Sequence, residues 1–138
     1  MQRISPRRQG DLGELSAMEW LGSKGYGVYY PVGHSPDTDL IADDGSALLR
    51  VQVKTTTQIN KRRWVVTICT RGGNQSWNGL VKRFSSSRCD RLFVTVADGR
   101  RWFMPAHAVG GGSAILLGGP KYAEYEVEAG RPLISERI

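Results

Sequence analysis

Residues Asp37 to Lys54 decide the fold, and they read DTDLIADDGSALLRVQVK. Two apolar runs flank the four residues Asp43 to Ser46, whose sequence is Asp-Asp-Gly-Ser. This composition favours a tight turn, because glycine accepts a positive φ and aspartate bonds to nearby backbone groups. The stretch therefore predicts two strands joined by a turn.

The second of these strands alternates between two kinds of residue. Successive side chains of a strand point to opposite faces, so one face carries Leu48, Arg50, Gln52 and Lys54, and the other carries Leu49, Val51 and Val53. Gln52 and Lys54 thus point the same way, beside a neighbouring strand that begins with acids. A carboxylate, an amide oxygen and an ammonium group on one face indicate a metal-and-phosphate site rather than a core.

Length and charge limit the class of protein. A chain of 138 residues fits one domain, 1–138, with residues 1–9 as a basic, flexible arm and 128–138 as a tail. The net charge of +6 favours an acidic partner such as nucleic acid, although solubility alone is the plainer explanation. No apolar run is long enough to span a membrane. Cys69 and Cys89 lack metal-ligand spacing, which favours reduced thiols and a cytoplasmic, intracellular protein.

The first helix is predicted over Gly10 to Lys24. At 100° per residue, Glu14 falls on the same side as Ala17, Met18 and Leu21. A carboxylate within an apolar stripe is costly unless it is paired or binds a cation. The alternative is an acid placed in the first turn by the helix dipole.

The rest of the chain predicts further short strands. We expect strands at 26–32, 64–70 and 90–96, with 101–105 returning from 90–96 as a hairpin. Residues 80–88 are expected to form a short helix or an ordered turn. The apolar pieces at 115–117 and 122–127 are expected to be edge strands.

Together these residues resemble the core of the PD-(D/E)XK nucleases. Pro36-Asp37 supplies the literal PD, but Asp39 occupies the place that this family usually gives its metal-binding acid. Gln52 departs from the pattern, since most members carry Asp or Glu there. The Gln-x-Lys version resembles the branch associated with group I intron homing endonucleases. The resemblance covers roughly residues 10 to 127 and implies an α/β, restriction-endonuclease-like core, with a mixed central sheet flanked by helices and Glu14 on the N-terminal helix.

The resemblance implies a catalytic set made of Glu14, Asp39, Gln52 and Lys54. Carboxylate and amide oxygens are hard ligands that suit Mg²⁺, and Mn²⁺ is expected to substitute. Glu14, Asp39 and Gln52 would hold the metal, and the family pattern adds the backbone carbonyl of Val53. Lys54 would orient or deprotonate the attacking water, or stabilise the developing charge. Gln52 removes one negative charge, so metal affinity should fall and Glu14 and Asp39 should matter correspondingly more.

Polar and basic residues outside this set are candidate DNA contacts. Cations would position the phosphate backbone, whereas amide and aromatic side chains would read or stack on bases. The alternatives are continuation of a strand or a solvated loop; the two histidines, His34 and His107, fit a turn and a helix start. The candidates are Arg7, Arg8, Thr55, Thr56, Gln58, Lys61, Arg62, Arg63, Asn74, Gln75, Trp77, Lys82, Arg83 and Arg88.

We therefore expect a metal-dependent DNA endonuclease with homing-type cleavage of duplex DNA. A Holliday junction resolving enzyme is the first alternative, favoured by small size and basic character. A non-catalytic DNA-binding protein that lost an acid at Gln52 is the second, and a small structural or interaction domain is a third. Because one copy covers little DNA, a homodimer or homotetramer is expected.

Overall fold

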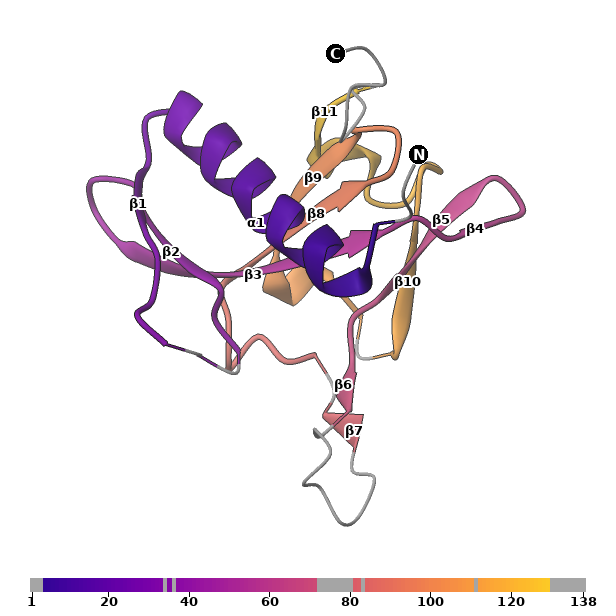
Figure 1. The fold of residues 1–138 in the computed structure, drawn as a ribbon, viewed down its shortest axis with the longest axis horizontal. Coiled ribbons are helices and arrows are strands. Elements are labelled where there is room, and N and C mark those ends of the chain that lie inside the picture. The colour runs from indigo at the N-terminus through magenta and orange to yellow at the C-terminus, as the bar shows by residue number, and fades with distance from the viewer. Residues whose placement is uncertain are drawn as a thin grey trace.

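The computed structural model describes residues 4–33, 35, 37–71, 81–82, 84–110 and 112–129 (Figure 1). Its centre is a six-stranded sheet of order β1-β2-β3-β8-β9-β11. The strands are β1 Gly27–Tyr29, β2 Leu40–Asp43, β3 Leu48–Thr56, β8 Arg91–Val96, β9 Arg101–Pro105 and β11 Glu126–Glu128. β3 and β8 pair in parallel and the other described pairs are antiparallel, so the predicted mixed sheet is confirmed.

The predicted hairpin is also present. β2 and β3 pair in register from Leu40 with Val51 to Asp43 with Leu48. The turn closes through the backbone N–H of Asp44, which donates to the carbonyl of Ala47 over 3.1 Å. Gly45 adopts a φ of +94°, a value that the missing side chain permits.

The long helix α1 (Pro6–Ser23) begins four residues earlier than predicted. Ser5 caps it, because the Ser5 hydroxyl accepts a hydrogen bond from the Arg8 N–H over 3.2 Å. Pro6 fits the first turn, where its missing N–H is not needed. Arg7 and Arg8 therefore belong to the helix and not to a flexible arm.

α1 packs on one face of the central sheet, as Figure 1 shows. Its buried Ala17, Trp20 and Leu21 contact apolar residues of β2, β3 and β8. Gly13 allows the helix to come close, since a Cβ atom there would collide with the Cγ2 atom of Thr55 on β3. This contact and the buried apolar stripe fix the height of α1 above β3.

A buried arginine ties α1 to the far side of the sheet. The guanidinium of Arg101 on β9 donates to the Ser16 carbonyl over 3.1 Å and to Glu19 over 2.9 Å. It also donates to Glu128 on β11 over 3.1 Å. α1 is thus held by close packing of Gly13 against Thr55 and by charge-assisted hydrogen bonds from Arg101 to Ser16 and Glu19.

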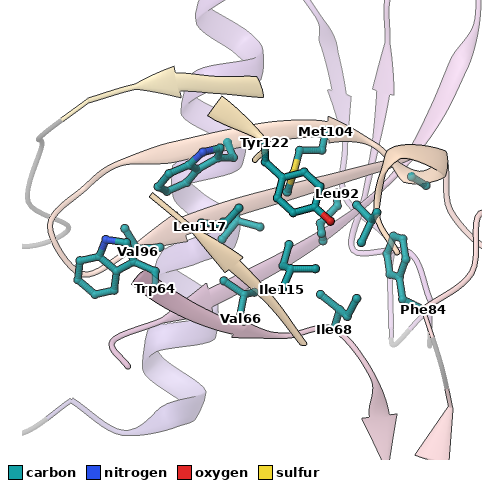
Figure 2. Close-up of a cluster of buried hydrophobic side chains, with 14 of the residues drawn as sticks. Trp64, Val66, Ile68, Phe84, Leu92, Val96, Met104, Ile115, Leu117 and Tyr122 are labelled. Carbon is teal, nitrogen blue, oxygen red and sulfur yellow. The ribbon is translucent and has the colours of Figure 1, made fainter. Parts of the chain in front are cut away.

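The opposite face of the central sheet is covered by a second sheet of order β10-β5-β4. These strands are β10 Ala114–Leu117, β5 Arg63–Thr67 and β4 Ile59–Asn60. Figure 2 shows inward side chains of β10 and β5 meeting those of β8 and β9 in one apolar cluster, which includes Trp64, Val66, Ile115, Leu117, Leu92, Val96 and Met104. Within the described part of the chain, α1 flanks one face and this sheet takes the place of a second flanking helix.

Two segments differ from the sequence-based prediction. Residues 81–82 form a strand, β7 Val81–Lys82, which pairs with β6 Thr70–Arg71, so the predicted short helix or ordered turn over 80–88 is wrong there, whereas residues 86–88 do form a turn. The segment 122–127 is split between the 3₁₀ turn η2 (Ala123–Tyr125) and β11. A further 3₁₀ turn, η1 (Ala106–Ala108), follows β9. Among the residues with an assigned structure, no helix is long and apolar enough to cross a membrane.

Candidate active site

The candidate site forms where β2 begins at Leu40 while its partner β3 continues to Thr56. Asp39 lies just before β2. Its backbone N–H donates to the Val51 carbonyl over 2.9 Å. Its carboxylate accepts a hydrogen bond from the Val53 N–H over 2.8 Å. Backbone and side chain together therefore fix this carboxylate beside the exposed edge of β3.

The backbone of Val53 also presents its carbonyl to the same place. The N–H and C=O groups of one strand residue point to the same side of the strand. Because the Val53 N–H points at Asp39, the Val53 carbonyl points toward this edge too. The pairing of β2 with β3 ends at Val51, so β2 does not cover this carbonyl.

Glu14 reaches the site from the middle of α1. Partial burial raises the pKa of its carboxyl group, and the negative charge of Asp39 raises it further. A hydrogen bond from the Tyr30 hydroxyl acts in the opposite direction and lowers this pKa. Two carboxylates that repel each other at a partly buried position form a place that a cation would stabilise.

Gln52 and Lys54 occupy the other face of β3. Val51 and Val53 pack with the α1 cluster, which places Gln52 and Lys54 on the opposite side, level with Leu92 and Val94 of β8. The Gln52 side chain is only 9% exposed and that of Lys54 is half-buried. Within the described residues the Lys54 ammonium has no ion pair or hydrogen bond, so it is available to an anionic ligand.

The donor set fits a divalent cation of the hard type. Glu14 and Asp39 supply carboxylate oxygens and Val53 a carbonyl oxygen, and Mg²⁺ binds oxygen ligands of this kind. The predicted fourth ligand, Gln52, lies on the face of β3 opposite α1. In the described ranges no three His, Cys, Asp or Glu side chains gather into a metal-binding group. A site here would therefore depend on the two carboxylates together with the Val53 carbonyl oxygen.

Tyr30 belongs to the site but was missed by the sequence analysis. It follows β1, and its hydroxyl bonds to Glu14, sixteen positions earlier in the chain. The sequence showed only an aromatic strand at this position. No local pattern pairs a strand-end tyrosine with a particular helix residue, so only the fold reveals the contact.

Asp37 and Arg88 form an ion pair with an N–O distance of 3.6 Å. The choice of Asp39 over Asp37 as the candidate ligand agrees with this arrangement, because the Asp37 carboxylate faces Arg88. Arg88 was predicted to contact DNA, whereas the structure gives it an internal acidic partner. Its role in this structure is to tie the segment before β8 to the segment before β2.

Three other predicted DNA contacts also have internal roles. Thr55 faces α1, where its hydroxyl accepts a hydrogen bond from Gln9 over 3.2 Å. Thr56 is buried, and its hydroxyl accepts from the backbone N–H of Gln58 over 3.0 Å. Arg63 packs its guanidinium against Gly119. Each of these side chains is oriented by a contact inside the protein.

The remaining predicted contacts divide into two groups. Arg7, Arg8, Gln58, Lys61 and Arg62 are exposed in the structure. Asn74, Gln75, Trp77 and Arg83 lie outside the described residues, as does the side chain of Lys82. His34 lies outside them too.

Comparison with known proteins identifies the family. A family model described as PD-(D/E)XK endonuclease matches residues 4–121, which cover helix α1, the hairpin and the strands up to β10. The chain belongs to the PD-(D/E)XK endonuclease family. Endonucleases of this family act on DNA and generally use divalent metal ions.

The fold of this PD-(D/E)XK protein is similar to that of a solved homing endonuclease. The match is to the bacterial homing endonuclease I-Ssp6803I, with a TM-score of 0.77, 24% sequence identity and 89% of each chain covered. This similarity confirms the predicted restriction-endonuclease-like fold. A comparison with curated proteins found no match.

Proposed function

We propose that this protein is a metal-dependent endonuclease that cleaves duplex DNA in the manner of a homing enzyme. The observation that carries the proposal is the Asp39 carboxylate held at the edge of β3 by the Val53 N–H, in a position from which its negative charge raises the pKa of Glu14 on α1. Glu14, Asp39, Gln52 and the Val53 carbonyl would hold Mg²⁺, and Mn²⁺ would substitute. When bound, the cation would neutralise charge on the phosphate.

The protein's own residues would position the reacting groups. Asp39 is oriented before any ligand binds, because its hydrogen bond to Val53 fixes the carboxylate. The Lys54 ammonium would bind the phosphate, orient the attacking water and stabilise charge as it develops on the phosphate oxygens. Lys54 is suited to this role because it has no acidic partner within the described part of the chain.

Gln52 distinguishes this site from one with three acids. A neutral amide oxygen ligates a cation less strongly than a carboxylate, so Glu14 and Asp39 would supply all of the negative charge. Gln52 is almost fully buried, which favours a role in which its side chain is held in one position rather than solvated. We expect weaker Mg²⁺ binding than in a three-acid site and an absolute requirement for both carboxylates.

The similarity in fold to a homing endonuclease supports duplex cleavage over junction resolution. One site of this kind cuts one strand. Cutting both strands of a duplex would then require a second copy, and we propose a homodimer or homotetramer related by symmetry.

A plasmid nicking assay tests this proposal. We expect cleavage in Mg²⁺ or Mn²⁺, none in EDTA, and loss of cleavage by Lys54→Ala with DNA binding retained. The matched control is Lys24→Ala, which removes a lysine at the end of α1 that lies over the Trp20 ring. Strong cleavage by the Lys54→Ala protein would contradict the mechanism.

A second measurement separates the alternatives. A four-way junction and a library of linear duplexes are offered in the same reaction. Preference for the junction whatever its sequence would favour the resolving enzyme. Metal-independent binding without any cleavage by the wild-type protein would favour the non-catalytic DNA-binding protein.

A further inference from the structure

The hairpin of β4 and β5 ends in an unusual turn. Asn60 pairs with Arg63, and the two residues between them, Lys61 and Arg62, have φ angles of 51° and 65°. Two-residue turns with positive φ at both central positions strongly favour Asn-Gly or Asp-Gly, because side chains with a Cβ atom crowd the backbone there. Here the two positions carry long cationic side chains instead.

Both side chains are exposed, so packing does not explain their presence. Many other described cations have an evident internal role. Arg50, Arg88, Arg100 and Arg101 form ion pairs, and Lys24 and Lys121 lie over aromatic rings. Neither Lys61 nor Arg62 has an ion pair within the described residues. Strained backbone is found at sites where a function requires it. What Lys61 and Arg62 provide at this strained turn is a pair of positive charges.

The base of the hairpin is rigid. Trp64 and Val66 of β5 lie in the buried cluster of Figure 2. The Val65 N–H donates to the Gln58 carbonyl over 2.9 Å. The Arg63 guanidinium donates to the Arg62 carbonyl over 3.3 Å while it packs against Gly119. The turn is therefore presented from a fixed support, and Figure 1 shows the hairpin extending outward from the body of the protein.

The turn also lies at a limited distance from the candidate site. β3 carries Lys54, and the chain reaches Lys61 seven residues later. Seven extended residues span at most about 25 Å. Consecutive phosphates of one DNA strand are about 3.4 Å apart along the helix axis. The Cα atoms of Lys54 and Lys61 are therefore no more than about seven phosphate spacings apart. The two lysine side chains extend this reach to about one helical turn of duplex.

We propose that Lys61 and Arg62 form a rigid cationic tip that binds phosphates of the same DNA duplex within about one helical turn of the cleaved bond. The proposal rests on the proposed DNA endonuclease function. It assigns the strained turn a positioning role, in which the tip sets where the duplex lies relative to Glu14, Asp39 and Lys54. Contacts to phosphates carry little sequence preference, so the tip would bind any duplex.

The test compares two double variants of the turn. Lys61→Asn/Arg62→Gly removes both charges and supplies the residues that the turn favours. Lys61→Gln/Arg62→Gln removes the same charges but keeps the unfavourable backbone. Lys24→Gln/Lys121→Gln is the control, since it lowers the net charge equally at two lysines that pack over aromatic rings. Melting temperature and affinity are measured for each, with a linear duplex of about three helical turns in Ca²⁺ as the probe.

Both turn variants should bind the duplex at least about tenfold more weakly at 0.1 M salt, and the slope of log K against log salt should become shallower by about 1.8, or 0.9 for each lost phosphate contact. Only the Asn-Gly variant should melt at a higher temperature than wild type. The control should keep most of the affinity and the slope.

Two results would overturn the inference. An unchanged salt slope in both turn variants would show that the tip does not touch phosphates. An unchanged melting temperature in the Asn-Gly variant would show that the turn is not strained. Wild-type cleavage of plasmid in Mg²⁺ is measured separately, so a protein that binds through the tip but does not cleave would contradict the proposed function alone.

Discussion

The carboxylate of Asp39 accepts a hydrogen bond from the backbone N–H of Val53 over 2.8 Å, fourteen residues along the chain. This bond joins the residue just before β2 to the middle of β3. It orients the carboxylate and, through the geometry of the strand, turns the Val53 carbonyl toward the same edge. The candidate metal site is therefore organised by the backbone of β3 as much as by its side chains.

Asp39→Asn should abolish most DNA cleavage while preserving the fold. The asparagine carbonyl can still accept the Val53 N–H, so only the charge is lost. Loss of a residue that hydrogen-bonds to a metal ligand lowers metal affinity or activity about 10- to 100-fold. Loss of the ligand itself should lower the cleavage rate at least about 100-fold. The initial rate of plasmid nicking in excess Mg²⁺ measures this.

Asp37→Asn is the matched control for that change, two residues away. Asp37 faces Arg88 and not the Val53 edge, so this variant should keep a rate within a few-fold of wild type. If the Asp37 variant lost activity and the Asp39 variant kept it, the assignment of the ligand would be reversed.

Tyr30→Phe should raise the Mg²⁺ concentration needed for half-maximal cleavage. The substitution removes the hydroxyl that hydrogen-bonds to Glu14 and leaves the ring. A hydrogen bond of ordinary net strength corresponds to about a two- to tenfold effect. Tyr29→Phe is the control, because this neighbouring tyrosine of β1 is also exposed and has no described contact with Glu14.

The same variant should change the pH dependence of cleavage. The Tyr30 hydrogen bond lowers the pKa of Glu14, so its removal raises this pKa. Glu14 must be ionised to bind a cation, and the acid limb of the rate profile should therefore move to higher pH. A shift to lower pH would show that the hydroxyl does not act through Glu14.

Gly13→Ala should destabilise the protein and lower activity. The new methyl group would collide with the Cγ2 atom of Thr55, and overpacking of this kind costs about 1–3 kcal/mol. Thr55→Ser removes only the colliding methyl group, so the double variant should regain the lost stability. Alanine is a better helix former than glycine, so helix propensity alone would make Gly13→Ala more stable, not less. Urea unfolding of wild type, the two single variants and the double variant measures the four stabilities that the comparison needs. If Gly13→Ala destabilised the Thr55→Ser protein as much as it destabilised wild type, the clash would not involve the Cγ2 atom of Thr55.

Asp90→Asn should make stability less dependent on pH in the acid range. The hydrogen bond from the Arg50 guanidinium lowers the pKa of Asp90 below the usual range of an aspartate. A carboxyl group with a depressed pKa in the folded state stabilises the protein above the unfolded pKa and loses this effect as pH falls through the folded pKa. Urea unfolding from pH 7 to below pH 3.8 should show a steeper loss for wild type than for Asp90→Asn. Asp98→Asn, in the turn before β9, is a control.

Local sequence pattern predicted the central hairpin and the alternation of β3, because turn chemistry and two-residue periodicity act over a few residues. It placed Gln52 and Lys54 on one face of a strand and Glu14 in a helix, and the structure shows both. It did not find Tyr30, the pair of Asp37 with Arg88, or the internal roles of Thr55, Thr56 and Arg63. Each of these depends on contacts between elements distant in sequence. The early start of α1 was missed because Ser5 and Pro6 were read as part of a basic arm.

The parallel pairing of β3 with β8 has a consequence for how such an enzyme can diverge. Parallel neighbours require a long connection, and here residues 57–90 run between the two strands, with the β4–β5 and β6–β7 hairpins inside them. The residues proposed for catalysis all precede this connection. The turn that joins β4 to β5 can therefore be lengthened or exchanged without disturbing the sheet edge near Glu14, Asp39 and Lys54, whereas Trp64 and Val66 of β5 pack in the core and must stay. A change of DNA target would then require a change in such a turn and not in the residues proposed for catalysis.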